Sequence, residues 1–180
     1  MPRLAALVAL SFAHAAPASA AAKIQRVVSP GGIEAWFVQD STVPLVAMQF
    51  AFTGGSAQDP AGKAGTASLV ADTLDEGAGD LDSKAYHERL ERRAIQMNFS
   101  VTRDYFRGSL RMLKENRDEA FDLLRLALTS PHFDAEPLER VRAQTLSLLR
   151  RESTTPGSIA SDRFWAAAYE GHPYARQPSG

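Results

Sequence analysis

The sequence contains no cysteine. A chain without thiols cannot form disulfides, bind a metal through thiolates or use a cysteine nucleophile. Histidine is also scarce, so a histidine-based site would have to draw on four residues, His14, His87, His132 and His172. His87 precedes a glutamate, as in the helical zinc motif HExxH, but the motif's second histidine is missing because position 91 is also glutamate. A lone histidine of this kind is usually a solvated side chain, and we expect this of His87 and His132.

The sequence also lacks a large net charge of either sign. The chain has 20 basic and 21 acidic residues, which gives a net charge of -1. It therefore lacks the positive potential that attracts a phosphate backbone, and we expect no nucleic-acid partner. The glycine-rich loop over 53–62 matches neither GxxxxGK[ST] nor GxGxxG, so nucleotide binding has no support either. The sequence also has no GxSxG nucleophile elbow, and nothing in it places a serine beside a histidine.

No apolar stretch reaches the roughly 20 residues that a membrane-spanning helix needs. The first residues instead have the pattern of a secretory signal peptide over 1–20: Arg3, an apolar run over 4–13 and the small-residue cleavage site Ala18-Ser19-Ala20. A membrane anchor is the alternative, but this run is too short for one. We therefore expect an exported protein without a membrane span, in a bacterial periplasm.

The composition is that of an ordinary globular protein, with 44% hydrophobic and 23% charged residues among 180. This length suits one domain of ordinary size. β-branched and aromatic residues predict strands over 24–28, 33–39 and 44–52, and turn residues between the first two predict a hairpin. Alternation of apolar and polar residues predicts a second hairpin, formed by 95–101 and 105–112.

Helices are expected at five places, 65–76, 83–93, 117–129, 134–153 and 156–169. The first should be largely buried, whereas the second is polar, should face water and has Ser83 as its expected N-cap. Asn116 and Glu119 have the spacing of a capping box for the third, whose Phe121, Leu124 and Leu128 share one face. The order of the elements predicts an α+β fold, in which helices pack on an antiparallel or mixed sheet.

Three carboxylates, Asp72, Asp75 and Glu76, lie close together at the end of the first expected helix. Such a group can bind a hard cation or supply paired acid and base. The alternative is a helix end that meets solvent. Nothing nearby resembles the twelve-residue loop of an EF-hand, so a calcium site has little support.

Several short motifs follow one another along nearly the whole mature chain. They are SPGGIEAWFV at 29–38, FAFTGGSAQDP at 50–60, LDEG at 74–77, IQMN at 95–98 and GHPY at 171–174. In this order they resemble motifs of the amino-terminal domain of the insulinase/pitrilysin family, which includes the mitochondrial processing peptidases. The resemblance implies the insulinase-like metallohydrolase fold for residues 21–180.

Active members of that family carry an inverted zinc motif, HxxEH, in which two histidines bind zinc and the glutamate acts as general base. The matching positions here are Ser68, Ala71 and Asp72, and no histidine occurs anywhere over 62–76. The family's third ligand, a glutamate, falls within 145–148, which reads Thr-Leu-Ser-Leu. The resemblance therefore implies a member without catalytic residues or bound metal.

The resemblance also suggests a role. It implies a non-catalytic homologue that pairs with a zinc-bearing catalytic subunit of the same family and helps to enclose peptide substrates, with zinc only in that partner. A zinc metalloendopeptidase of the same family and a structural core subunit of a larger complex are the alternatives. Because family subunits contain two such domains, we expect this chain to be truncated and its domain to be incomplete at the C-terminal end.

Overall fold

The computed structural model describes residues 23–180. The expected signal peptide over 1–20 lies outside the described residues. The chain divides at Val43 and Pro44 into two compact units. No helix within the described part has the length and hydrophobicity to cross a bilayer.

The first unit contains the predicted hairpin. Strand β1 (Ile24–Val28) pairs antiparallel with β2 (Glu34–Val38). The turn between them is closed by Ser29, whose Oγ accepts a hydrogen bond of 2.9 Å from the backbone N–H of Ile33. Arg26 and Glu34 form an exposed ion pair across the strands, with Nε and Oε1 2.7 Å apart.

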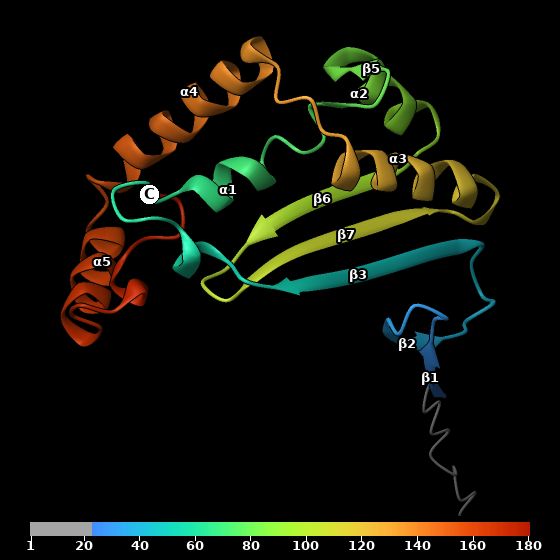
Figure 1. The fold of residues 1–180 in the computed structure, drawn as a ribbon, viewed down its shortest axis with the longest axis horizontal. Helices are drawn as coiled ribbons and strands as arrows, with labels where there is room; N and C mark the ends of the chain where they lie inside the picture. The colour runs from blue at the N-terminus through green and yellow to red at the C-terminus, as the bar shows by residue number, and fades with distance from the viewer. Residues whose placement is uncertain (1–22) are drawn as a thin grey trace, which may run out of the picture. The chain divides into compact units, whose positions relative to one another are not determined.

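The second unit is built on a three-stranded antiparallel sheet in the order β3-β7-β6 (Figure 1). The strands are β3 (Leu45–Thr53), β6 (Gln96–Val101) and β7 (Tyr105–Leu113). The central strand β7 pairs with β3 on one side and with β6 on the other. The second predicted hairpin and the predicted α+β fold class are therefore confirmed.

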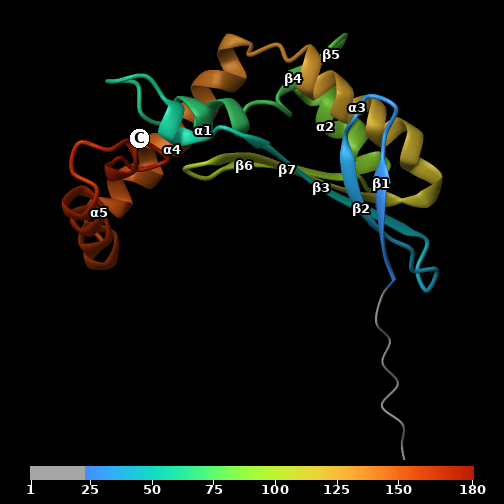
Figure 2. The ribbon, with the colours of Figure 1, turned by 60° about the horizontal axis from the view of Figure 1, so that its bottom comes forward.

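Helices pack against one face of this sheet. Helices α1 (Thr66–Ala71) and α2 (Ser83–Arg92) contact β6, while α3 (Arg117–Thr129) contacts β7 (Figure 2). The last two helices are α4 (Ala135–Glu152) and α5 (Pro156–Ala168). Three short 3-10 turns complete the unit, at Ser56–Gln58, Lys114–Asn116 and Pro173–Ala175.

The core lies between the sheet and these helices. Its largest fully buried side chains include Tyr86 of α2, Leu110 and Met112 of β7, and Leu123 of α3. The Tyr86 hydroxyl donates a hydrogen bond of 2.8 Å to the backbone carbonyl of Leu123, which ties α2 to α3. The prediction that 83–93 faces water is wrong for one side of the helix, because Tyr86 and Leu90 lie four residues apart on one helical face and are both buried, while the charged side chains of the other side are exposed.

The first helix is shorter and less buried than the sequence predicts. It ends at Ala71 instead of continuing to 76, and Val70 is exposed. The buried Thr73 hydroxyl donates 2.7 Å to the carbonyl of Leu69, while its N–H bonds the carbonyl of Val70 in a tighter turn. Such local side-chain bonds compete with continuation of the helix. Two unpredicted short strands follow, β4 (Gly77–Ala78) and β5 (Leu81–Asp82), paired antiparallel.

The residue that caps α2 also differs from the prediction. Asp82 is the N-cap, and its Oδ1 accepts a hydrogen bond of 2.7 Å from the N–H of Ala85. Ser83 instead donates its hydroxyl to the carboxylate of Glu76, 2.6 Å away. Both residues can cap a helix, so the sequence alone did not decide between them.

The predicted capping box of α3 is wrong, although the helix has the predicted bounds. The Asn116 amide donates to the carbonyl of Arg93 at 2.8 Å, and Glu119 forms an ion pair with the Arg93 guanidinium at 2.7 Å. The expected apolar face is also shifted. Phe121 is exposed, and the buried side chains are Ala120, Leu123, Leu124 and Ala127.

Tyr86→Phe tests the polar link between α2 and α3. Removing the hydroxyl leaves the buried Leu123 carbonyl without this donor, so the free energy of unfolding should fall by about 1–2 kcal/mol. Urea unfolding followed by circular dichroism measures the change. Tyr105→Phe, on an exposed side chain, is the matched control and should change stability by less than about 0.5 kcal/mol. Equal losses in both variants would contradict the role given to this bond.

Candidate functional site

A pocket of about 480 Å³ lies between the turn after α1, strand β6 and helix α4. The turn contributes Asp72, Asp75 and Glu76. Phe99 of β6 and Val141 of α4 form apolar parts of the wall. Carboxylates and apolar side chains thus line the same cavity.

The structure brings together most of the positions singled out by the zinc-motif comparison. Ala71, at the end of α1, and Asp72 line this pocket. Thr145 and Leu148, from the stretch where the third ligand was expected, line the same pocket from α4. Ser68 is not part of this lining. Its hydroxyl donates a hydrogen bond of 2.7 Å to the backbone carbonyl of Pro178.

The donor atoms at these positions do not fit a catalytic zinc ion. Ala71 and Leu148 offer no ligand atom, a threonine hydroxyl is a poor one, and Ser68 is engaged elsewhere. Asp72 is the one remaining candidate ligand among these positions. It is not enough, because a catalytic zinc site normally has three protein ligands. Within residues 23–180, no group of three or more His, Cys, Asp or Glu side chains is arranged to hold a metal ion.

Glu76 is the most constrained carboxylate of the pocket. It is buried, its Oε2 accepts hydrogen bonds from Ser83 and from the guanidinium of Arg140, and the Nε2 of His87 lies 3.6 Å away. Burial alone would raise the pKa of this carboxyl, but the bonds from Ser83 and Arg140 lower it below its ordinary value. The interpretation of this helix end as simply meeting solvent is therefore wrong for Glu76.

Asp72 and Asp75 are in the opposite electrostatic situation. Desolvation in the pocket raises the pKa of both carboxyls. At Asp75, repulsion from Glu76 and Asp72 raises the pKa further, whereas a backbone hydrogen bond and His87 lower it. A raised pKa means that the fold disfavours the charged form. Asp72 is exposed, so solvent screens its charge, whereas the half-buried Asp75 is kept at some cost to stability, as binding sites often keep such groups.

The three histidines of the described part have separate partners. His87 faces Glu76. His132 lies with Nε2 2.5 Å from the carbonyl of Gly79 and Nδ1 3.4 Å from Asp134. His172 accepts a hydrogen bond of 3.2 Å at Nδ1 from the N–H of Tyr174. These contacts assign no ligand or catalytic role to any of them.

A contact that sequence reasoning missed joins the GHPY segment to the start of α1. The Arg176 guanidinium donates to the carbonyls of Asp59, at 2.9 Å, and Ala57, at 3.2 Å. The Asp59 carboxylate in turn accepts hydrogen bonds from the N–H groups of Gly65, at 2.8 Å, and Ala67, at 2.9 Å. Gly65 has a φ of 87°, and a Cβ there would lie 2.5 Å from a backbone oxygen of 179. This close approach explains why position 65 is glycine. The glycine is the sequence signal that could have indicated this contact with the end of the chain.

A family model described as insulinase (peptidase family M16) matches residues 36–179. The non-peptidase homolog YmxG of Helicobacter pylori is 30% identical over 135 residues, which cover 74% of this chain and 31% of that protein.

Two solved structures share the fold. The peptidase M16 inactive domain from Pseudomonas fluorescens has a TM-score of 0.81 and 28% identity, over 88% of this chain and 39% of its own. A protease from Helicobacter pylori has a TM-score of 0.76 and 21% identity, over 88% of this chain and 38% of its own. This chain thus spans less than half the length of each relative.

Asp75→Asn tests whether the pocket holds a carboxylate that the fold disfavours. Because the folded-state pKa is raised, the penalty exists above that pKa and disappears as the pH falls below the ordinary value of 3.8. The variant should therefore have a higher free energy of unfolding at pH 7, and the gain should vanish in acid. Urea titrations at both pH values measure it, with the exposed Asp80→Asn as control. A loss of stability at pH 7 would contradict this assignment.

Glu76→Gln should have the opposite effect. The folded-state pKa of Glu76 is lowered, so its contribution is complete above the ordinary value of 4.5 and is lost as the pH falls through the folded-state value. We expect a loss of about 1–3 kcal/mol at neutral pH that shrinks in acid. Glu88→Gln, whose carboxylate forms only exposed pairs with Lys84 and Arg92, is the control for charge removal. A loss independent of pH would show that the ionised form of Glu76 is not what stabilises the fold.

Proposed function

Because this chain belongs to the insulinase family, peptidase family M16, we propose that it is a non-catalytic member that pairs with a zinc-bearing subunit and binds peptides. The resemblance recognised in the sequence is confirmed. Two relatives are themselves described as a non-peptidase homologue and as an inactive domain, which agrees with the expectation that this chain is not an enzyme.

The observation that carries the proposal is the pocket beside α1. The two stretches that supply zinc ligands in active relatives, according to the resemblance, meet here across one cavity. Four of the residues that line it occupy positions matched to zinc ligands or to the general base, and three of these four, Ala71, Thr145 and Leu148, lack a good metal ligand. The cavity is thus present without the side chains that bind zinc, and we propose that zinc is held only by the partner.

Peptide binding is supported by the edge of the sheet. Among the strands of residues 23–180, β6 pairs with β7 on one side and with none on the other. An exposed strand edge can accept an extended peptide as a further strand, with main-chain hydrogen bonds supplying affinity. Asn98 and Phe99 of β6 also line the pocket, so a peptide added to this edge would pass beside it. Export to a bacterial periplasm, suggested by the first 20 residues, is part of the same proposal.

The proposal predicts a complex with a zinc-bearing insulinase-family subunit from the same organism. Co-expression of the two chains should give a stable heterodimer by light scattering after size exclusion. Peptide cleavage should occur with the mixture and not with this chain alone. Elemental analysis should find zinc in the partner and close to none in this chain.

A partner whose general-base glutamate is changed to glutamine is the matched control. It should keep the heterodimer and lose cleavage, which separates assembly from chemistry. About one zinc per chain together with cleavage by this chain alone would overturn the proposal in favour of a zinc metalloendopeptidase. A stable complex that contains no peptide-cleaving subunit would instead indicate a structural core subunit.

A further inference from the structure

The face of the three-stranded sheet opposite its helices carries positive charge without any negative charge. β3, β6 and β7 contain no aspartate or glutamate. Arg107 and Arg111 lie on β7 at alternate positions that point away from the core, since Leu110 and Met112 are buried. Both arginines are exposed. Among residues 23–180, neither takes part in an ion pair.

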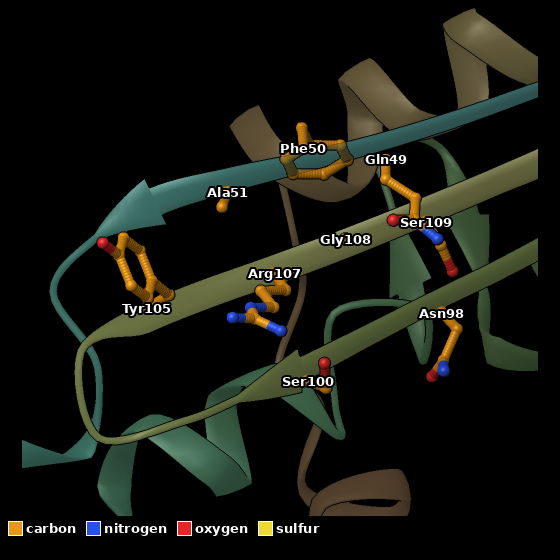
Figure 3. A pocket seen from close by; sticks show the side chains of 9 residues that line it. All are labelled: Gln49, Phe50, Ala51, Asn98, Ser100, Tyr105, Arg107, Gly108 and Ser109. Atoms are coloured by element: carbon orange, nitrogen blue, oxygen red, sulfur yellow. The ribbon is translucent and has the colours of Figure 1, made fainter.

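Small side chains on both sides of Arg107 leave a hollow around it. In the register of the sheet, Arg107 lies between Ala51 of β3 and Ser100 of β6 (Figure 3). The next row on the same face is Gln49, Ser109 and Asn98. These two rows line a hollow of about 620 Å³, within the range of sizes that bind ligands.

The chemistry of the hollow fits an anion. Arg107 has a planar guanidinium that can hold a carboxylate through two parallel hydrogen bonds. Tyr105, on the same strand, has its ring 5.6 Å from the guanidinium carbon, within the range of a cation–π contact that orients the group. The surrounding amides and hydroxyls can donate hydrogen bonds, and no carboxylate among the lining residues competes for Arg107.

We propose that this hollow binds an acidic side chain of an extended peptide, with Arg107 as the carboxylate receptor. The inference deepens the proposed peptide-binding function and rests on it. Successive rows on one face of a sheet are two residues apart, about 7 Å, which is also the spacing of side chains on one side of an extended peptide. In a peptide paired with the edge of β6, a glutamate beside Ser100 points to the same face as Arg107, and the next side chain of that side falls in the row of Asn98 and Ser109. Charge complementarity selects acidic peptides over neutral or basic ones.

Peptide binding to the full chain tests the proposal. The probe is a fluorescein-labelled peptide in which threonine alternates with glutamate, and the reference has glutamine in place of every glutamate. Fluorescence anisotropy should show that the acidic peptide binds more tightly, with an affinity that falls as salt is added. Arg107→Gln should weaken binding of the acidic peptide by about tenfold or more and leave the glutamine peptide unaffected.

Arg111→Gln is the matched control. It removes the same charge from the same face of β7, two rows away and outside the hollow, and should change the affinity by less than about twofold. Ser100→Glu is a second, independent variant. It places a carboxylate directly across from Arg107, where a cross-strand ion pair should neutralise the receptor without weakening the sheet. Its thermal stability should match or exceed that of the native chain while acidic-peptide binding is lost.

The outcomes separate this inference from the function on which it rests. Equal binding of both peptides, with Arg107→Gln silent, would overturn the acidic specificity and leave peptide binding intact. Equal losses in Arg107→Gln and Arg111→Gln would show that net charge attracts the peptide, which also overturns the assigned site. If neither peptide binds, the inference and the peptide-binding part of the proposed function fail together, whatever the result of the heterodimer experiment.

Discussion

The second unit depends on the two-sided pairing of β7. Hydrogen-bonded to β3 and β6, this strand presents Gly108, Leu110 and Met112 to the helices and Arg107 and Arg111 to the other face. A shift of one residue would exchange the two faces and bury the arginines. The apolar core therefore fixes the register, and the register places an arginine between small neighbours. Packing on one face determines the binding chemistry available on the other.

In the pocket beside α1, positions that match the zinc motif by resemblance have structural roles. The Ser68 hydroxyl donates a hydrogen bond to the Pro178 carbonyl, which links α1 to the segment after GHPY. Ala71 is buried and forms part of the pocket wall. Nearby, Glu76 accepts hydrogen bonds from Ser83 and Arg140. These roles stabilise the fold, so the cavity persists although its donor set does not suit zinc.

The pocket and the hollow differ in charge and meet at one strand. Carboxylates dominate the pocket beside α1, whereas Arg107 dominates the hollow on the face of the sheet opposite its helices. Asn98 of β6 lines both cavities. A peptide along β6 would thus have acidic groups of the chain on one side of the strand and a basic group on the other. Under the proposed function, this arrangement would let the chain select peptides by charge.

The two hairpins, the α+β class and the family could all be predicted from the sequence, because period-two alternation, turn residues and ordered motifs are local signals. The early end of α1, the cap at Asp82 and the burial of Tyr86 could not be predicted, because they depend on contacts made in the folded chain. These contacts are the Thr73 bond to Leu69, the Asp82 bond to Ala85 and the Tyr86 bond to Leu123. The convergence of 71–76 with α4, and the hollow around Arg107, likewise depend on strand register and helix packing. Such relations between distant segments have no signature within a short window of sequence.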